Sequence, residues 1–500
     1  MRSILPAALI LLFVSAGPPP PVPTRREVSL QTEGPLDSKT LADFDGDGRL
    51  DIFIASRRRY ILFLQRPDGF RPKPDQIGPF PPGSVLYDSG DVTGDGAADV
   101  VILTQTGFSY LSLQKGKFPP RPISLVEDPS VFQGSTPSVM WDRDFLRDLD
   151  GDGLEDLILP IPSGVRIYRA TPGGEFRSSE ELLIPLGAAA RAGRDRLGTE
   201  VVSSFWLSDL YPGDYTGDGR PDLGLIREGA LWVYAAGEDG GWPRRATRRI
   251  PIRRPRVSDK SGSEGKRGGL FRVDFQLPLS IEDINGDKFP DFITSHVGQG
   301  STHIFLGSPS REEMRTPSQI LKVPGFSIFN SIQDLDGDGR GDLIVASVPK
   351  IGLWSALKIF ISRSITAQAH VYYNRGSRLF PLVPDYRLEI DVPIIARKGK
   401  RMGFGTRLIV SATGDLDGDG IKDLILRTGD DRIGVFPGLR KAGFAEKPSE
   451  EILIRSEEGD PHQVVAPTTK DLNGDGRDDL ILYYRSWDRQ SDRISVVLSE

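Results

Sequence analysis

Short apolar runs recur along the chain, and glycine, proline or charged residues separate each run from the next. Early in the chain, residues 51–55 (Asp-Ile-Phe-Ile-Ala) and 60–64 (Tyr-Ile-Leu-Phe-Leu) form two such runs, and residues 68–70 follow as a turn. The last unit has the same order, with runs at residues 480–484 and 494–498. Runs of about five residues between turn formers are typical of β-strands, because helices are usually longer. The pattern therefore predicts an all-β fold built from repeated units.

A nine-residue polar sequence stands before an apolar run in every unit. It reads Asp-x-(Asp/Asn/Thr)-Gly-Asp-Gly-x-x-Asp, with one exception at its second glycine, and its eight copies begin at Asp43, Asp91, Asp148, Asp214, Asp283, Asp334, Asp415 and Asp471. A short strand precedes each copy and further strands follow it, which indicates four strands in each unit. Units of this kind, about 50–60 residues long, are typical of β-propeller blades. We expect a single propeller of four-stranded blades. Eight blades are favoured, and seven would result if one unit lay in an insertion.

The two ends of the chain predict how the ring closes. The last unit, from about Gln463 to Glu500, contains only three expected strands, whereas residues 27–31 (Glu-Val-Ser-Leu-Gln) form a strand that belongs to no other unit. If this N-terminal strand joins the last blade, no blade is incomplete and no sheet edge is left open at the seam. The expected propeller therefore covers residues 27–500.

The first residues resemble a secretory signal peptide. Arg2 precedes the apolar run of residues 4–14, and small residues follow at Ser15 and Ala16. The run is too short for a bilayer span, and no later segment is long and apolar enough for one. We expect a signal peptide at residues 1–16, a proline-rich linker at residues 17–26, and a secreted, periplasmic or cell-surface protein. The chain has no cysteine and so no disulfides, and bound cations would serve to stabilise a secreted protein in their place.

The polar nine-residue sequences have the composition of calcium loops. Carboxylates at positions 1, 3, 5 and 9 and a backbone carbonyl at position 7 make an all-oxygen donor set, and the glycines at positions 4 and 6 let the backbone curl around it. Ca²⁺ accepts six to eight such ligands, whereas Mg²⁺ prefers a rigid octahedron and Zn²⁺ prefers cysteine and histidine. An EF-hand also needs a Glu at position 12 and a helix after it, and position 12 here is apolar or Thr in every copy. We therefore expect up to eight Ca²⁺ ions and no EF-hand.

The predicted ligands comprise five residues in each loop. They are Asp43, Asp45, Asp47, Arg49 and Asp51; Asp91, Thr93, Asp95, Ala97 and Asp99; Asp148, Asp150, Asp152, Leu154 and Asp156; Asp214, Thr216, Asp218, Arg220 and Asp222; Asp283, Asn285, Asp287, Phe289 and Asp291; Asp334, Asp336, Asp338, Arg340 and Asp342; Asp415, Asp417, Asp419, Ile421 and Asp423; and Asp471, Asn473, Asp475, Arg477 and Asp479.

The eight loops differ in their expected affinity. Thr93 and Thr216 replace the carboxylate at position 3 by a hydroxyl, and Asn285 and Asn473 replace it by an amide. Lys288 stands where the other loops have their second glycine, so it must adopt a strained backbone or distort the loop. The loops that begin at Asp43, Asp148, Asp334 and Asp415 are expected to bind most tightly. The Asp283 loop is expected to bind most weakly.

Bound calcium would reverse the charge of the protein. The formal net charge is −6, and loss of Arg2 with the signal peptide makes it −7. Eight Ca²⁺ ions would bring the loaded chain to about +9, so anionic partners become plausible. The most basic stretch runs from Arg244 to Arg267. It is interpreted either as a strip that binds an acidic glycan or envelope ligand, or as an outermost strand protected by charge and proline against edge pairing, followed by a flexible loop.

The loops resemble those of the FG-GAP/VCBS repeat, whose best-known relatives form the β-propeller of integrin α subunits. The resemblance rests on the Asp-x-Asp-Gly-Asp-Gly-x-x-Asp loops and extends over nearly all of the expected mature chain. It implies a propeller with calcium in loops between two strands of a blade. The chain departs from the family in having a loop in every unit, and the Phe-Gly and Gly-Ala-Pro elements are not legible. The partner-binding surface of integrins is therefore not implied.

These features favour a binding or scaffold module for a protein or glycan ligand, with structural calcium. The alternatives are a glycan-active lyase or hydrolase with a site in the propeller channel, and a purely structural envelope component. No nucleophile elbow, His-Glu-x-x-His motif or phosphate-binding glycine loop accompanies the four histidines, so enzyme chemistry has no specific support. Nothing in the sequence predicts a nucleic-acid partner.

Overall fold

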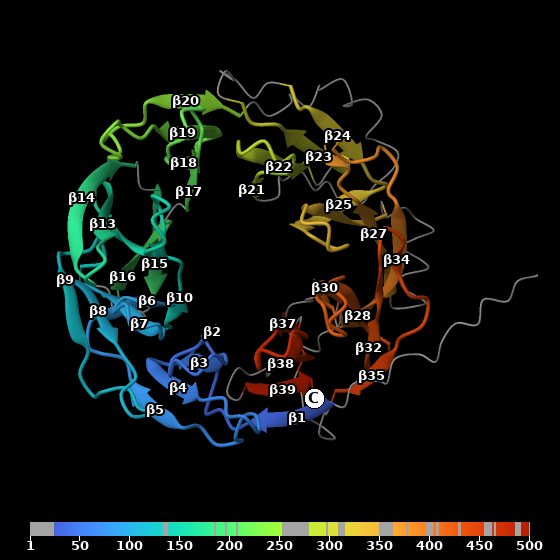
Figure 1. The fold of residues 1–500 in the computed structure, drawn as a ribbon, viewed down its shortest axis with the longest axis horizontal. Coiled ribbons are helices and arrows are strands. Elements are labelled where there is room, and N and C mark those ends of the chain that lie inside the picture. Colours follow the sequence, from blue (N-terminus) through green and yellow to red (C-terminus); the bar gives the residue numbers. More distant parts are fainter. Residues whose placement is uncertain are drawn as a thin grey trace, which may run out of the picture.

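The structure is a computed structural model that describes residues 25–133, 139–184, 187–195, 198–206, 209–252, 280–296, 299–308, 316–349, 364–376, 379–396, 404–406, 410–428, 432–454, 463–464, 467–485 and 492–499. Its antiparallel sheets follow one another around a closed ring, with the first strand of each sheet toward the centre and the last toward the outside (Figure 1). The expected all-β propeller of eight blades is confirmed.

The first four blades take up the N-terminal half of the ring. Blade 1 comprises β2 (Ser38–Ala42), β3 (Asp51–Ser56), β4 (Arg59–Phe63) and β5 (Gln76–Pro79). Blade 2 comprises β6 (Ser84–Gly90), β7 (Asp99–Thr104), β8 (Gly107–Leu111) and β9 (Ile123–Glu127), and β10 (Trp141–Asp142) pairs in parallel with its first strand. Blade 3 comprises β11 (Leu146–Arg147), β12 (Asp156–Ile161), β13 (Gly164–Ala170) and β14 (Phe176–Leu183). Blade 4 comprises β17 (Leu210–Gly213), β18 (Asp222–Arg227), β19 (Ala230–Tyr234) and β20 (Arg248–Pro251).

The other four blades complete the ring. Blade 5 comprises β21 (Ser280–Glu282), β22 (Asp291–His296), β23 (Ser301–Phe305) and β24 (Gln319–Lys322). Blade 6 comprises β25 (Phe326–Gln333), β26 (Asp342–Val348), β27 (Ser364–Tyr372) and β28 (Tyr386–Ala396), extended by β29 (Phe404–Thr406). Blade 7 comprises β30 (Val410–Gly414), β31 (Asp423–Arg427), β32 (Arg432–Phe436) and β35 (Glu450–Leu453). Blade 8 comprises β37 (Thr468–Lys470), β38 (Asp479–Arg485), β39 (Arg493–Ser499) and β1 (Arg25–Leu30), and β36 (Gln463–Val464) also pairs with β38.

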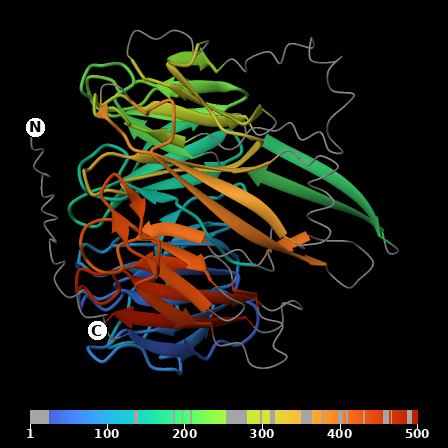
Figure 2. The same ribbon diagram turned by 90° about the vertical axis from the view of Figure 1, so that its right-hand side faces the viewer.

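Two hairpins lie outside the four-stranded pattern. One consists of β15 (Gly187–Asp195) and β16 (Gly198–Trp206) and stands between blades 3 and 4 in the chain. Figure 2 shows this green hairpin projecting from one face of the ring, the same side toward which the long orange strands of blade 6 extend. The other is the short pair β33 (Gly438–Leu439) and β34 (Gly443–Phe444) in blade 7.

The N-terminal strand closes the ring, as expected. β1 runs antiparallel to β39, with Val28 opposite Val496, and becomes the outermost strand of blade 8. The Arg25 guanidinium also reaches blade 7, where its Nε donates to Glu450 Oε2 at 2.6 Å and its Nη2 donates to the Leu416 carbonyl at 3.0 Å. The two ends of the chain are thus joined by a β-ladder and by a side-chain contact across the seam.

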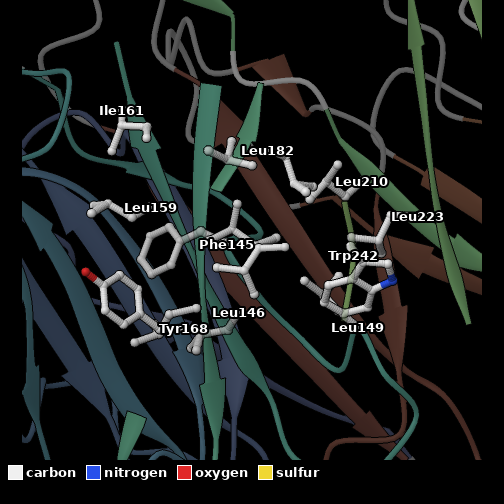
Figure 3. Packing of buried hydrophobic residues seen from close by; sticks show 14 of the residues in the cluster. Phe145, Leu146, Leu149, Leu159, Ile161, Tyr168, Leu182, Leu210, Leu223 and Trp242 are labelled. Atoms are coloured by element: carbon white, nitrogen blue, oxygen red, sulfur yellow. The ribbon is translucent and has the colours of Figure 1, made fainter. Parts of the chain in front are cut away.

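The core lies between the blades. The second strand of a blade is covered on both faces by the neighbouring blades, and every residue of β3, β12 and β22 is accordingly buried. The outermost strands β20, β24 and β35 each bury only one of their four residues. One cluster joins blades 2, 3 and 4 through residues such as Phe145, Leu159 and Leu223 (Figure 3). Other clusters join the remaining neighbours, including blade 8 to blade 1.

Among the described residues, no helix has the length and apolar character needed to span a bilayer. The expected signal peptide at residues 1–16 and nearly all of the linker at residues 17–26 lie outside the described residues.

Candidate metal centres

Every polar nine-residue sequence forms the connection between the first and second strands of its blade. Residues 43–51, for example, follow the last residue of β2, and their ninth residue, Asp51, is the first residue of β3. The equivalent aspartates open the second strands of the other seven blades: Asp99, Asp156, Asp222, Asp291, Asp342, Asp423 and Asp479. The loop is thus the same connection in every blade, and the first strand that precedes it lies toward the centre of the ring (Figure 1).

The aspartate at position 1 organises the curl of the loop. In the first loop Asp43 Oδ1 accepts hydrogen bonds from the amides of Gly46 at 2.7 Å and Asp47 at 3.1 Å, and Asp43 Oδ2 accepts one from the amide of Gly48 at 2.7 Å. Both glycines have positive φ, 72° and 84°, which a residue with a Cβ rarely adopts. The position-1 aspartates of the other loops accept equivalent bonds, so their carboxylates are held in place by the loop backbone.

Lys288 keeps this geometry in spite of its side chain. Its φ is 71°, within the left-handed region, and its amide donates to Asp283 Oδ2 at 2.8 Å, as the glycine amide does in the other loops. Of the two outcomes expected for this residue, a strained backbone and a distorted loop, the structure has the strained backbone.

The aspartate at position 9 has a structural role that sequence reasoning missed. Asp51 is completely buried; its Oδ2 accepts a hydrogen bond from the amide of Phe44 at 3.0 Å, and its Oδ1 accepts one from the amide of Gln65 at 2.8 Å. It thereby ties the loop to the end of the third strand of its blade. Six other position-9 aspartates accept the same two kinds of backbone hydrogen bond: Asp156, Asp222, Asp291, Asp342, Asp423 and Asp479. The repeat of Asp at this spacing was visible in the sequence, but only the fold shows which amides it reaches.

Burial makes the charge on these aspartates costly. Desolvation raises the pKa of Asp51, Asp342 and Asp423 to about 7, and that of Asp99 and Asp291 to about 6. In most cases the neighbouring loop carboxylates raise the pKa further. A cation placed among these carboxylates would have the opposite effect, because it favours their charged forms.

Carboxylates converge in four loops among the described residues. Groups of three, with ligand atoms within 4.8 Å of one another, are Asp43, Asp45 and Asp51; Asp148, Asp150 and Asp152; Asp334, Asp336 and Asp342; and Asp415, Asp417 and Asp423. These are the four loops with Asp at position 3, from which the tightest binding is expected. In the Asp283 and Asp471 loops the position-3 amide donates instead to the position-5 carboxylate, from Asn285 to Asp287 at 2.9 Å and from Asn473 to Asp475 at 3.2 Å.

At position 7 of each loop, the backbone amide donates a hydrogen bond to the carboxylate at position 5. In the first loop the amide of Arg49 donates to Asp47 Oδ1 at 3.0 Å, and the equivalent bond recurs at Ala97, Leu154, Arg220, Phe289, Arg340, Ile421 and Arg477. These bonds fix the backbone at position 7 but do not involve the position-7 carbonyls. Their participation as ligands stays a prediction.

The model of the FG-GAP-like repeat matches residues 43–102, 148–225 and 415–482. The chain carries FG-GAP-like repeats. The matched segments contain six of the eight loops, and the loops that begin at Asp283 and Asp334 lie outside them. No curated protein sequence matches the chain.

Solved structures similar to the chain include a lectin from Agrocybe aegerita, described for its specific recognition of non-reducing terminal N-acetylglucosamine. It is 16% identical, with a TM-score of 0.44, over 86% of this chain and 94% of that one. Two structures of BBS1N in complex with ARL6DN, soaked with mercury and with lead, are 11% and 10% identical, each with a TM-score of 0.34 over 84% of this chain and 94% of that one. At such low identity the ligands and partners in these descriptions concern those proteins alone.

Neighbouring loops are hydrogen-bonded to one another across blades. The amide at position 8 of one loop donates to a carbonyl at position 1 or 2 of the loop in the preceding blade: Ala98 to Asp43 at 2.7 Å, Leu50 to Leu472 at 2.9 Å, Lys422 to Leu335 at 3.0 Å and Asp478 to Asp415 at 2.6 Å. The loops therefore belong to the interface between blades as well as to their own blade.

Cationic side chains of the chain itself lie against several loop carboxylates, which the sequence did not predict. Arg169, at the end of β13, contacts Asp150 with its Nη1 at 2.9 Å and stacks on Trp242 with 4.2 Å between the guanidinium carbon and the ring centroid. Lys441, from blade 7, reaches the loop of blade 6, with its Nζ 3.3 Å from Asp338 Oδ2 and 3.6 Å from Asp336 Oδ2.

One carboxylate of the Asp334 loop provides a test of whether the loops fit a cation. Asp336 is 1% exposed, and its Oδ2 has no hydrogen-bond partner among the described residues. Its nearest cation is the Lys441 ammonium at 3.6 Å, which is longer than a hydrogen bond. A buried carboxylate oxygen without a donor is unfavourable unless a positive charge lies beside it. Asp336 belongs to the group with Asp334 and Asp342 whose ligand atoms lie within 4.8 Å of one another, so this donor set fits a hard cation.

The basic stretch from Arg244 to Arg267 is only partly described, since residues 253–279 lie outside the described part. Within it, β20 is the outermost strand of blade 4, as the edge-strand interpretation requires. Arg244 pairs with Glu181 at 2.9 Å, and Arg249 lies over Trp232, with the guanidinium carbon 5.3 Å from the ring centroid, and 3.6 Å from Glu228. Some of its positive charge is therefore already balanced within the protein.

The described histidines are packing residues of the strands. His296, His303 and His370 are at most 9% exposed, and the rings of the first two are 4.4 Å apart. Burial lowers the pKa of His303 to about 4, and the charge of its neighbours lowers it further. His303 Nε2 contacts Ser301, but its Nδ1 has no hydrogen-bond partner among the described residues, so this Ser–His pair lacks the orienting acid of a hydrolase triad. His462 lies outside the described residues.

Proposed function

We propose that the chain is a calcium-binding β-propeller that acts as a binding or scaffold module outside the cytoplasm, and that its calcium is structural. The observation that carries the calcium proposal is the convergence of three carboxylates in each of four loops, together with the buried oxygen of Asp336 that accepts no hydrogen bond among the described residues. Ca²⁺ suits a donor set of several carboxylate oxygens on a curled, glycine-containing loop better than Mg²⁺ or Zn²⁺ does.

A structural role for calcium follows from the position of the loops. Each loop joins two strands of a blade, and several are hydrogen-bonded to the loop of the next blade. Without a cation, the converging carboxylates repel one another at the interface between blades. Bound Ca²⁺ would remove this repulsion and stabilise the folded ring in proportion to its occupancy.

The calcium proposal is tested by the metal content and thermal unfolding of the purified protein. After dialysis against buffered Ca²⁺, the protein should retain several calcium ions for each chain, and its melting temperature should fall in EDTA and return with Ca²⁺ in excess over Mg²⁺. Asp45→Ala, which removes a converging carboxylate, should reduce both readings. Asp68→Ala, in an exposed turn outside the loops, should change neither. A melting temperature that does not depend on Ca²⁺ contradicts the proposal.

The protein is proposed to bind an anionic glycan or envelope ligand through the basic stretch from Arg244 to Arg267, at the outer edge of blade 4. The support is the exposed edge strand β20 together with the positive charge that calcium loading would add. Charge reversal at Arg248, Arg249, Arg253 and Arg254 should weaken retention on a heparin column, whereas reversal at Arg57 and Arg58, on a turn of blade 1, should not. Equal retention of the two variants would reduce the stretch to a protected sheet edge.

The export of the protein is proposed from the N-terminal sequence alone. Expression with its own first 26 residues should yield a mature chain that begins near Gly17, as measured by intact mass.

Screening for turnover of acidic polysaccharides, alongside glycan-array binding, separates the module from the enzyme: saturable binding without turnover supports the module. If neither a glycan nor a protein is captured, a purely structural envelope component is the better interpretation.

A further inference from the structure

The turn between β33 and β34 brings a lysine of blade 7 to the FG-GAP loop of blade 6. Lys441 Nζ lies 3.3 Å from Asp338 Oδ2 and 3.6 Å from Asp336 Oδ2, which are positions 5 and 3 of that loop. The side chain of Lys441 is 53% exposed, whereas that of Asp336 is 1% exposed. A half-exposed ammonium thus lies beside a buried carboxylate that a metal ion would also use.

The backbone around Lys441 is fixed against blade 6. The amide of Gly443 donates to the hydroxyl of Tyr373, which follows β27, at 3.0 Å. The amide of Ala442 donates to the Leu439 carbonyl at 2.9 Å and closes the turn, and Lys441 itself has a positive φ of 56°. A non-glycine residue in the left-handed region is held there by its surroundings. The fixed backbone of the turn therefore places the Lys441 side chain next to the loop of blade 6.

The other converging loops are not equal in this respect. In the Asp148 loop, Asp150 Oδ2 forms an ion pair with Arg169 Nη1 at 2.9 Å. Among the described residues, neither Asp45 nor Asp417 forms an ion pair. The four loops with Asp at position 3, which look equivalent in sequence, therefore form two classes. In one class the position-3 carboxylate lies beside an Arg or Lys side chain of the protein, and in the other class it does not.

We infer that Lys441 is a tethered counter-ion that competes with Ca²⁺ in the Asp334 loop, so that this site fills after the Asp415 site. The inference rests on the proposed binding of calcium. The Lys441 ammonium lies beside Asp336 and Asp338, and Asp336 also belongs to the group of converging carboxylates with Asp334 and Asp342. A Ca²⁺ ion bound to these carboxylates would repel the ammonium at this short distance, so Lys441 must leave when Ca²⁺ enters. Until then it stabilises the calcium-free loop.

The experiment compares Lys441→Gln with Lys115→Gln. Lys115 is a matched control: it occupies the equivalent turn of blade 2, between Gln114 and Lys117, and it also has a positive φ, of 52°. No ion pair joins Lys115 to a loop carboxylate among the described residues. Melting temperatures are measured in EDTA and at a series of free Ca²⁺ concentrations, and calcium binding is measured in competition with a chelator of known affinity.

Lys441→Gln should have opposite effects in the two conditions. In EDTA its melting temperature should fall below that of the wild type, because the loop loses its counter-ion, and the increase on calcium addition should be larger. One calcium site should bind about 2- to 5-fold more tightly, as expected for the loss of a half-exposed ion pair. Lys115→Gln should show neither change. In a background of Asp336→Asn with Asp338→Asn, which removes both carboxylates that the two cations share, Lys441→Gln should no longer change calcium affinity.

Three results would overturn the inference. An equal fall of the melting temperature with and without calcium would make Lys441 an ordinary structural ion pair. A tighter site that persists in the background of Asp336→Asn with Asp338→Asn would show that the effect arises elsewhere in the protein. An unchanged calcium affinity of Lys441→Gln would show that Lys441 does not compete with Ca²⁺. Failure of the proposed function is distinct from all of these, since the wild type itself would then retain no calcium.

Discussion

Replacement of Asp51 by Ala tests the structural role of the position-9 aspartates. In the folded protein Asp51 is completely buried and accepts hydrogen bonds from the amides of Phe44 at 3.0 Å and Gln65 at 2.8 Å. Alanine leaves both amides buried without an acceptor. Each unsatisfied buried amide costs about 1–3 kcal/mol, so Asp51→Ala should lower the free energy of unfolding by about 2–6 kcal/mol.

The matched comparison is Asp47→Ala in the same loop. Asp47 is also a predicted calcium ligand, but it is exposed and accepts its bonds from Arg49, a residue two positions away. In EDTA its loss should therefore change the free energy of unfolding by only about 1 kcal/mol or less. In calcium both variants should lose the stabilisation that the first loop provides. The difference in the free energy of unfolding between the two variants in EDTA therefore measures the buried hydrogen bonds of Asp51 separately from its role as a metal ligand.

The assay is urea unfolding at pH 8, followed by tryptophan fluorescence and circular dichroism, in EDTA and in excess Ca²⁺. Coincident transitions for the two probes are needed before midpoints are converted to free energies, because a ring of eight blades can unfold in stages. If Asp51→Ala and Asp47→Ala have the same midpoint in EDTA, the reasoning is refuted, and Asp51 would matter only as a metal ligand.

Three further predictions follow from single residues. Lys288→Gly should raise the free energy of unfolding by about 0.5–1 kcal/mol in urea titrations, because it relieves a positive φ of 71°, whereas Lys288→Ala should not. Arg25→Ala removes a side chain that is 4% exposed and bonded to Glu450 across the seam, and should cost about 2–4 kcal/mol by the same assay, against less than about 0.5 kcal/mol for the exposed pair lost in Arg59→Ala. His303, whose folded pKa is lowered to about 4 from 6.5, favours the folded state fully above pH 6.5 and loses this contribution as the pH falls toward 4. His303→Gln should therefore flatten the fall in urea midpoint between pH 7 and pH 5, and an unchanged slope would contradict the assignment.

The architecture was predictable because it is encoded locally and repeated. Eight loops with the same spacing of Asp and Gly, each followed by a short apolar run, indicate eight strand-loop-strand units wherever they lie in space. Closure by the N-terminal strand was also predictable, because one unpaired strand at residues 27–31 and one incomplete last unit can be counted in the sequence. For Lys288 the loop pattern predicted either a strained backbone or a distorted loop, and only the structure showed that the backbone is left-handed.

The partners of the loop carboxylates were not predictable to the same degree. The amide of Gln65, which Asp51 reaches, is fourteen residues away, and the amide of Asn374, which Asp342 reaches, is 32 residues away. The intervening lengths differ from blade to blade, so no fixed spacing marks the second bond. The hairpin of β15 and β16 was also missed, because its small and polar residues do not form an apolar run.

The sequence by itself determined the repeated units, their loops and the residue types that a hard cation requires, since these depend on short-range patterns of charge, glycine and apolar side chains. Only the tertiary structure decided which loops contain a cation of the chain itself. Lys441 lies 103 residues from Asp338, and it meets that carboxylate because adjacent blades pack side by side and a hydrogen bond to Tyr373 holds the turn in place. Four loops that are equivalent as sequence are thereby made unequal as sites, because the electrostatic environment of a carboxylate depends on neighbours in space and not on neighbours in the chain.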